Sequence, residues 1–403
     1  MVVQLTPRTP SHATAEVGPP VSLDVAAGLL AGLNREQRRA VTHGKGPQLV
    51  VAGPGTGKTE VVTRRVAWLI ATKRARPAEI LALTFTDNAA DEMQARVDLL
   101  VPYGQADAAI HTFHAFGDRL LREYAFEIGL AGDVQLITRA EAVVLLRDHL
   151  FDLGLERYRP LGDPTRFLGA LVDLFGRAKD EGIDPPRMSA FAARAADTAT
   201  DDAQRDAAAA LAEQSIAYGR YQSLLAQRGL IDHGDQLALP LRLLRERPSV
   251  SAAVVGSYRY LLVDEFQDMN RAQMELVFAR TGRDRNVTVV GDPDQAIYAF
   301  RGAAQDNLRS FAATHPDLRR VVLRRNYRSR RPIVEAAQRL IGHGPRRPVH
   351  APAEHQLAAR RSRRPAPVRL VSYATPEMEA DGVAAEVARR VAQGEAPRDF
   401  AIL

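Results

Sequence analysis

The sequence has no cysteine among its 403 residues. Disulfide bonds, thiolate metal sites and a catalytic thiol are therefore excluded. No apolar run reaches the ~20 residues that a membrane-spanning helix needs. The N-terminus has no basic-then-apolar signal pattern. These absences predict a cytoplasmic protein that does not enter a membrane.

Size and charge set the next bounds. A chain of 403 residues is long enough for two or three domains. Its apolar fraction of 46% and charged fraction of 25% are those of a globular protein. The net charge of +6 favours a polyanionic partner, with nucleic acid foremost. Most of the basic residues are arginine, which a GC-rich genome would also produce, so charge alone leaves this point open.

A glycine-rich segment supplies the strongest motif, Gln48-Leu-Val-Val-Ala-Gly-Pro-Gly-Thr-Gly-Lys58-Thr59. An apolar strand precedes it and a helical pattern follows it, which is the context of a phosphate-binding loop. Backbone N–H groups and the helix N-terminus would face phosphate oxygens. We expect Lys58 to reach the β- and γ-phosphates and the Thr59 hydroxyl to bind Mg²⁺. The predicted cofactor-binding loop comprises Ala52, Gly53, Pro54, Gly55, Thr56, Gly57, Lys58 and Thr59. Ala52 stands where the strict motif has glycine.

Two carboxylates follow a second apolar strand, Tyr260-Leu-Leu-Val-Asp264-Glu265. In a phosphate-loop ATPase, Asp264 would hold the metal and Glu265 would act as general base. Gln295, after the strand 286–291, can hydrogen-bond a γ-phosphate or the attacking water. Arg328 is a candidate γ-phosphate sensor. The alternative is that the two acids form a turn and a helix cap. The predicted catalytic residues are Lys58, Asp264, Glu265, Gln295 and Arg328, and the predicted metal ligands are Thr59 and Asp264.

The order of predicted elements indicates an α/β fold. Strands at 80–85, 108–110, 260–263 and 286–291 alternate with helices, which favours a parallel sheet with ligands at the C-terminal strand ends. The alternation stops between 115 and 229. Helical periodicity at 140–153, 165–179 and 203–228 predicts an all-helical insertion, with a loop at Pro185-Pro186. A second α/β unit begins near Val321, with a loop at 344–367, a strand at 368–373 and the start of another strand at 400–403.

Other residues are candidates for base recognition. The Gln37 amide can both donate to and accept from an adenine edge, and Tyr327 can stack on adenine. Phe85 lies at the predicted sheet edge, although a core position is its ordinary explanation. Phe300 beside Arg301 suits stacking on a single-stranded base while the guanidinium holds its phosphate.

His111 and His114 have a spacing that would suit a metal site. No carboxylate or third ligand supports such a site in the sequence. We therefore expect no metal ion at these histidines.

Several motifs in one order resemble the superfamily 1 helicases of the UvrD/PcrA/Rep type. They are Leu33-Asn-Arg-Glu-Gln37, Ala52-Gly-Pro-Gly-Thr-Gly-Lys-Thr59, Thr84-Phe-Thr86, Thr112-Phe-His114, Asp264-Glu-Phe-Gln-Asp268, Gly291-Asp-Pro-Asp-Gln-Ala-Ile-Tyr298, Phe300-Arg-Gly-Ala303 and Asn326-Tyr-Arg-Ser329. The resemblance covers residues from about 30 to 403, and the motifs at 264–268 and 326–329 are its most specific parts.

The resemblance implies a 3′–5′ DNA helicase, driven by Mg-ATP hydrolysis between two RecA-like domains and acting in repair or recombination. It implies that Gln37 and Tyr327 bind adenine. It also implies that Gln267 and Asp268 couple the nucleotide and DNA sites. The single-strand path would be lined by Phe85, His114, Phe300 and Arg301. Partners would be single-stranded and duplex DNA, together with other repair proteins or a missing C-terminal half.

The implied domains follow the resemblance. They are a disordered tail at 1–24, a first RecA-like ATPase domain at 25–114 plus 230–315, a helical accessory domain at 115–229, and a partial second RecA-like domain at 316–403.

Three departures from the family pattern stand out. Asp87-Asn88 replaces a usual Asn-Lys, Phe300 replaces a common Trp, and the late motifs of the family are absent from the sequence. The alternative expectation is therefore an ATP- and DNA-binding module without motor activity that needs a missing C-terminal half. A helicase–nuclease of the RecB-like kind would need a nuclease domain that these 403 residues do not contain.

Overall fold

The computed structural model describes residues 23–101, 108–280, 286–298, 307–343, 358–360 and 367–403. Residues 1–22, in the tail expected to be disordered, lie outside the described residues, as do Phe300 and Arg301. Within the described ranges, no helix is both long and apolar enough to cross a membrane.

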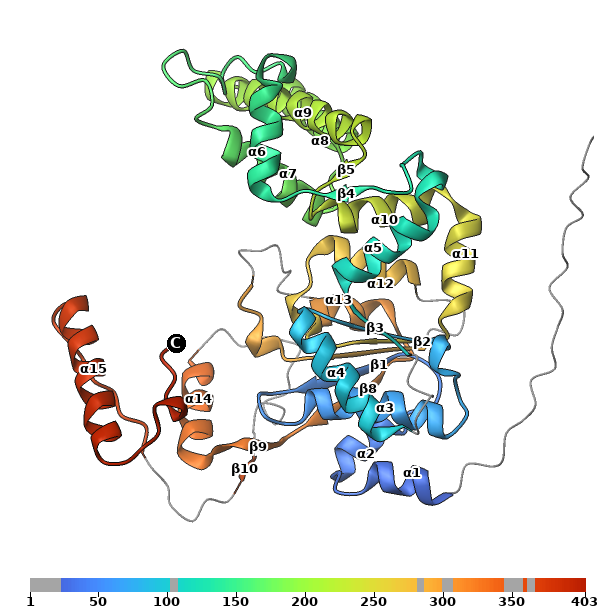
Figure 1. Ribbon diagram of the computed structural model, residues 1–403, viewed down its shortest axis with the longest axis vertical. Helices are drawn as coiled ribbons and strands as arrows, with labels where there is room; N and C mark the ends of the chain where they lie inside the picture. Colours follow the sequence, from blue (N-terminus) through green and yellow to red (C-terminus); the bar gives the residue numbers. More distant parts are fainter. Residues whose placement is uncertain (1–22, 102–107, 281–285, 299–306, 344–357, 361–366) are drawn as a thin grey trace, which may run out of the picture.

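A six-stranded sheet forms the centre of the molecule (Figure 1). Every strand pairs with its neighbours in parallel, in the order β3-β2-β6-β7-β1-β8. The strands are β1 (Gln48–Ala52), β2 (Ile80–Thr84), β3 (Ala109–Thr112), β6 (Tyr260–Val263), β7 (Val287–Gly291) and β8 (Arg319–Leu323). Four of them, β1, β2, β6 and β7, are buried along their whole length because helices cover both faces. The predicted parallel α/β class is confirmed.

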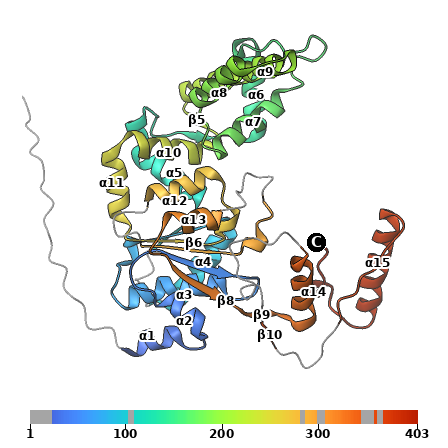
Figure 2. The same cartoon turned by 180° about the vertical axis from the view of Figure 1, so that it is seen from behind.

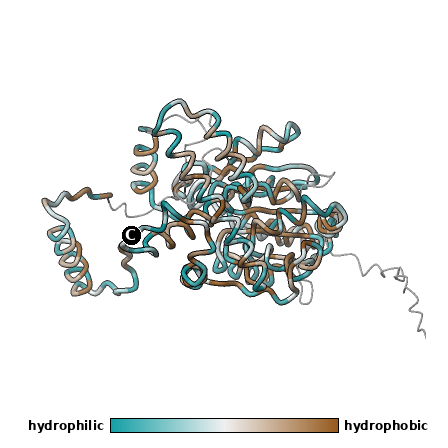
Figure 3. Tube along the Cα trace, turned by 90° about the horizontal axis from the view of Figure 1, so that it is seen from above, coloured by the Kyte–Doolittle hydropathy of each residue, from teal (hydrophilic) through white to brown (hydrophobic). Residues whose placement is uncertain are grey.

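Alternate side chains of each strand enter two separate cores. On one face, Val50, Ala82 and Leu262 pack with α1 (Leu23–Leu30), α2 (Arg35–Val41), α3 (Lys58–Ala71) and α4 (Asp87–Leu100). On the other face, Leu49 and Leu261 pack with α5 (Phe113–Tyr124), α10 (Asp235–Glu246), α11 (Pro248–Ser257), α12 (Arg271–Arg280) and α13 (Asn307–Thr314). Figure 2 shows the same two layers from behind. Apolar positions, brown in Figure 3, run through the sheet and the helices beside it.

A helical insertion follows α5, as the loss of alternation predicts. It contains α6 (Arg139–Asp148), α7 (Leu168–Asp180), α8 (Pro185–Thr198) and α9 (Asp202–Gln227), with a small parallel pair β4 (Gln135–Leu136) and β5 (Leu230–Ile231) at its base. Its core is its own, and Phe175 stacks there on Tyr218 and Tyr221. The Pro-Pro pair at 185–186 begins α8 and does not form a loop. Asp184 caps the helix, and proline is tolerated in a first turn, where an N–H has no helical partner.

The C-terminal part contains β9 (Arg325–Arg330), α14 (Arg331–Gly342), β10 (Ala358–Arg360) and α15 (Pro376–Ala392). Short 3₁₀ turns occur at Pro77–Glu79, Ala125–Ile128, Leu150–Leu153, Phe266–Asp268, Pro293–Gln295 and Pro397–Asp399. No residue of α15 is buried, and Figures 1 and 2 show this helix standing to one side of the sheet.

Three expectations for this region need correction. The ranges 368–373 and 400–403 form no strand, since apolar alternation makes a strand only where another strand pairs with it. The expected loop at 344–367 contains β10, which pairs with β9. The first sheet also takes its edge strand β8 from the range 316–403 that we assigned to the second RecA-like domain, because β8 pairs along the whole of β1.

Candidate nucleotide and DNA site

The phosphate-binding loop is shaped by two glycines in left-handed conformation. Gly55 has φ +66° and Gly57 has φ +89°, a region that favours glycine. A Cβ at Gly55 would lie 2.6 Å from Cβ of Arg328, and one at Gly57 would lie 2.8 Å from Nε2 of Gln37. The loop then enters α3 at Lys58, so the N-terminal N–H groups of this helix face the loop. Glycine is therefore required here by conformation and by space.

The Gln37 side chain contacts the loop itself. Asn34 caps α2, and the Oε1 of Gln37 accepts from the Asn34 N–H at 3.0 Å in a reciprocal capping box. Its Nε2 donates to the carbonyl of Thr56 at 3.0 Å. The capping arrangement thus fixes the amide that we predicted to read adenine, and the buried Gln37 lines the cavity described below.

A buried arginine holds α2 and α3 together behind the loop. Arg65 donates to the carbonyl of His43 at 2.6 Å, to that of Val41 at 3.1 Å and to the hydroxyl of Thr288 at 3.0 Å. Burial lowers its pKa to about 10. The guanidinium therefore stays charged at neutral pH and is solvated by carbonyl dipoles.

The start of β9 docks on the phosphate loop through Asn326. Its Nδ2 donates to the carbonyl of Pro54 at 2.7 Å, and its Oδ1 accepts from the N–H groups of Arg328 at 2.9 Å and Ser329 at 2.7 Å. The N–H of Tyr327 donates to the carbonyl of Gly55 at 2.7 Å. These bonds place two predicted site residues, Tyr327 and Arg328, beside the loop.

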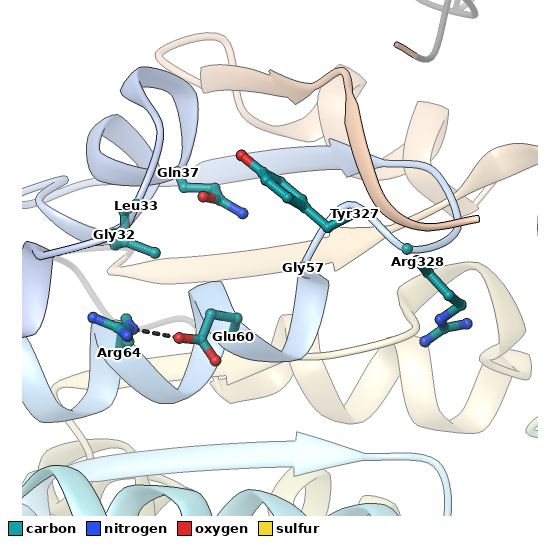
Figure 4. A pocket seen from close by; sticks show the side chains of 9 residues that line it. Gly32, Leu33, Gln37, Gly57, Glu60, Arg64, Tyr327 and Arg328 are labelled. Atoms are coloured by element: carbon teal, nitrogen blue, oxygen red, sulfur yellow. Dashed lines mark hydrogen bonds and ion pairs between the residues drawn. The ribbon is translucent and has the colours of Figure 1, made fainter. Parts of the chain in front are cut away.

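A cavity of about 400 Å³ lies between these elements. Its lining residues are Gly32, Leu33, Gln37, Gly55, Gly57, Glu60, Arg64, Tyr327 and Arg328. Figure 4 shows the Gln37 amide and the Tyr327 ring on one side and the ion pair of Glu60 with Arg64 on the other. The Tyr327 hydroxyl accepts from Asn34 Nδ2 at 2.9 Å. An aromatic face and an amide edge at one end of a phosphate loop suit a purine base.

Lys58 meets two other predicted catalytic residues. Its Nζ lies 2.6 Å from Oε2 of Glu265 and 3.2 Å from Oε1 of Gln295. Glu265 has φ +49°, which is rare for a residue other than glycine and typical of functional sites. The C-terminal ends of β1, β6 and β7 thus bring these three side chains together, as the parallel topology predicts.

The predicted metal ligands also lie together. The Thr59 hydroxyl is 3.5 Å from Oδ2 of Asp264, whose Oδ1 accepts from the N–H of Glu265 at 3.0 Å. Burial, aided by the charge of Glu265, raises the pKa of Asp264 to about 7 and outweighs the opposing effect of Lys58. A carboxylate and a hydroxyl are oxygen ligands of the kind that Mg²⁺ prefers.

Gln267 links the carboxylates to the next strand end. Its Nε2 donates to Oε2 of Glu265 at 2.9 Å and to Oδ2 of Asp268 at 3.0 Å, and its Oε1 accepts from the N–H of Asp292 at 2.9 Å. Burial raises the pKa of both Asp268 and Asp292 to about 6. A buried amide thus holds three acidic residues in one network.

Two of the predicted DNA-binding residues, Phe85 and His114, follow the C-terminal ends of β2 and β3. Phe85 stacks on Tyr298, with ring centroids 5.6 Å apart. His114, at the start of α5, stacks on the exposed His233 at 3.9 Å. Burial, with the charge of His233, lowers the pKa of His114 to about 3. The other two predicted DNA-binding residues, Phe300 and Arg301, lie outside the described residues.

Sequence reasoning missed four residues of the site. Asn326 and Asn34 were assigned no contact with the loop or with Tyr327, and Glu60 and Arg64 were assigned to a helix only. The tendency of asparagine to bond backbone groups a few residues ahead is the one local signal that indicates Asn326. The other contacts join distant parts of the chain.

A nucleoside triphosphate with Mg²⁺ fits this donor set. The loop around Gly55 and Gly57 is a backbone cradle that a side chain would fill. Lys58 provides a cation at its end, and Thr59 with Asp264 provides oxygen ligands. These features, on a parallel sheet with helices on both faces, define a RecA-like nucleotide-binding core.

Comparison with known proteins agrees with this class. The chain belongs to the UvrD/REP helicase N-terminal domain family, whose model matches residues 33–316. It is 35% identical over 316 residues to the ATP-dependent DNA helicase PcrA of Leuconostoc citreum, covering 78% of this chain and 40% of that protein. It is 38% identical over 323 residues to the ATP-dependent DNA helicase UvrD1 of Mycobacterium tuberculosis strain H37Rv, covering 78% and 39%. The chain spans about two fifths of the length of these curated relatives.

Proposed function

We propose that this chain is the nucleotide- and DNA-binding front part of an ATP-dependent DNA helicase, working in the cytoplasm in repair or recombination with 3′–5′ polarity. The observation that carries the proposal is the convergence of Lys58, Glu265, Gln295 and Asp264 on one phosphate loop. Family membership and the names of the relatives support the same activity.

We infer a role for each residue of the nucleotide site from its neighbours. The Lys58 ammonium would leave its ion pair with Glu265 for the phosphate oxygens, because a triphosphate carries more negative charge than one carboxylate and attracts the cation more strongly. Glu265 would then be free to take the proton of the attacking water as general base. Thr59 and Asp264 would hold Mg²⁺, which supplies charge neutralisation at the phosphates. Arg328 would sense the γ-phosphate from β9.

Base and DNA binding would use the neighbouring surfaces. Gln37 and Tyr327 would hold adenine in the cavity that they line. Phe85 and His114, each already paired with a second ring, would stack on bases of a single strand. We include Phe300 and Arg301 in that path from the sequence alone.

The test is ATP hydrolysis by purified 1–403 with and without single-stranded DNA. Lys58→Ala removes the phosphate-binding cation. The matched control is Lys45→Ala, which changes an exposed lysine before β1, at the N-terminal end of that strand and so away from the phosphate loop. A DNA-stimulated rate that survives in Lys45→Ala and is lost in Lys58→Ala supports the motor. An unstimulated rate, equal in all three proteins, contradicts it.

The second candidate is a binding module without turnover that needs a C-terminal half. It is favoured by the fact that the chain spans only about two fifths of its relatives. In that case, ATP and single-stranded DNA would bind to 1–403 and Lys58→Ala would lose the ATP binding. Hydrolysis would stay at the level of that variant until the missing half was supplied in trans.

A further inference from the structure

The helical insertion meets the ATPase core at the end of α7. This helix packs against α10 and α12, as its position above α10 in Figure 1 indicates. Its last two residues make contacts in different directions. The buried Lys179 points to the segment that returns from the insertion, and Asp180 points to the segment that follows the catalytic carboxylates.

Lys179 fixes the return segment at residues 232–235. Its Nζ lies 2.6 Å from Oδ2 of Asp232 and 2.9 Å from Oδ1 of Asp235. The Tyr221 hydroxyl donates to the same Oδ2 of Asp232 at 2.8 Å. Between these two acids lies His233, which stacks on His114. The buried lysine therefore anchors the turn whose His233 ring stacks on His114, a residue of the proposed DNA path.

Asp180 contacts the catalytic side. Its Oδ1 accepts from Nδ2 of Asn270 at 2.8 Å. Asn270 is buried and also caps α12, because its Oδ1 accepts from the N–H of Gln273 at 2.9 Å. It lies two residues after Asp268, in the segment that begins with Asp264. One asparagine thus uses its oxygen for the core helix and its nitrogen for the insertion.

The same segment is held from a second side. The amide of Asn307, on α13, donates to the carbonyl of Met269 at 2.7 Å. Gln267 holds Glu265 and Asp268 from within. The bond to Asp180 connects the end of this segment to the last residue of α7, in the insertion.

We propose that Asp180 and Asn270 are positioning residues whose hydrogen bond sets the catalytic carboxylate segment 264–268 relative to the helical insertion. The consequence of this bond, which rests on the proposed function, is that a movement of His233 would be transmitted through α7 to Asp264 and Glu265. Strand binding at the two rings would shift the turn held by Lys179, and the adjoining Asp180 would shift with it. The geometry of the carboxylates would then depend on whether DNA is bound.

The two amide atoms of Asn270 allow a selective test. Asn270→Asp keeps the oxygen that caps α12 but loses the donor and sets two carboxylates face to face. Burial raises the pKa of Asp180 to about 6, with Glu181 and Asp232 adding to it and Arg177 opposing it, so the assay at pH 8 keeps this acid ionised. The double variant Asp180→Asn with Asn270→Asp restores the bond in the reverse direction. Asp180→Asn alone retains an acceptor oxygen.

The first readout is hydrogen exchange of amides 264–268 in the full chain, which does not depend on turnover. We expect exchange about tenfold faster in Asn270→Asp, from the loss of one buried charge-assisted bond, and near wild-type exchange in the double variant. Asn286→Asp is the control, since it places a carboxylate at another buried asparagine, which lies before the N-terminal end of β7. If Asn270→Asp does not fold, Asn270→Ser keeps a capping oxygen but cannot reach Asp180.

The second readout is the ATPase rate with and without single-stranded DNA. Asn270→Asp should reduce the stimulation several-fold while leaving strand affinity unchanged, and the double variant should recover it. Unchanged exchange in Asn270→Asp, or failure of the double variant to restore it, overturns the proposal. If the wild type shows no stimulation, the proposed function fails and the exchange data alone still decide whether the link exists.

Discussion

Removing the Asn326 side chain should weaken nucleotide binding without touching any phosphate ligand. In Asn326→Ala, the carbonyl of Pro54 and the N–H groups of Arg328 and Ser329 lose their partners. One of these bonds joins β9 to the loop and the other two hold the local conformation of β9. Each net bond contributes about 0.5–1.5 kcal/mol, so the docked conformation of β9 should lose about 2–4 kcal/mol from the three together. Among the described residues, the direct hydrogen bond that then remains between β9 and the loop is the one from the Tyr327 N–H to the Gly55 carbonyl.

The loss should appear in affinity because Tyr327 and Arg328 line the cavity only while β9 is docked. A ligand that binds the docked state alone loses affinity in proportion to the undocked fraction. We expect the dissociation constant for ATP to rise at least about tenfold, since each 1.4 kcal/mol is a factor of ten. Titration with a fluorescent ATP analogue, beside thermal unfolding, measures both quantities.

Asn286→Ala is the matched control for this measurement. Asn286 is also buried, and its Oδ1 accepts from the Gly46 N–H at 2.8 Å. It precedes β7, however, and so lies at the N-terminal ends of the strands, away from the phosphate loop. The control should lower the melting temperature and keep ATP affinity. If Asn326→Ala binds ATP as tightly as the control does, docking of β9 does not shape the nucleotide site and the reasoning is refuted.

Two further predictions concern pH and packing. The pKa of Asp264 is raised from 3.8 to about 7, so between these pH values the folded state binds more protons than the unfolded state. The free energy of unfolding without Mg²⁺ should therefore fall as pH rises from about 4 to about 7. Denaturant melts that show an equal fall in Asp264→Asn would contradict the assignment. Gly117→Ala would place a Cβ 1.8 Å from the backbone oxygen of Gln236, where α5 crosses α10. This overpacking should lower the free energy of unfolding by at least about 1–3 kcal/mol. An unchanged melting temperature would show that the two helices can separate freely.

The nucleotide site could be predicted from the sequence because its residues follow strand ends. Asp264 comes directly after an apolar strand, and Lys58 and Gln295 lie in the short segments that follow two others. Parallel strands place their C-terminal ends at one edge of the sheet. Local pattern therefore sufficed to group residues that are more than 200 positions apart. The contact of Lys58 with Glu265 and Gln295 is a consequence of topology alone.

Contacts that depend on the packing of whole elements could not be predicted in this way. Asn326 bonds Pro54 across 272 residues, and Asn270 bonds Asp180 across 90, yet neither pair shares a periodic pattern. The apolar run at 321–323 indicates a strand but does not encode which sheet it joins. Helix α8 shows the same limit at short range, because Pro185 is compatible with either a loop or a first helical turn.

The edge strand β8 connects the local sequence pattern with the long-range contacts of the site. It pairs with β1 in a register that sets Leu323 opposite Ala52, and β9 begins two residues later at Arg325. The register therefore fixes where Asn326 meets the loop. A slip of one residue would move the chain by about 3.3 Å and turn each side chain to the other face. Leu323 is buried in the core beside α3, so the slip would also remove it from that core. The position of Arg328 at the phosphate loop is thus determined by hydrophobic burial in the first sheet, before any contact with nucleotide.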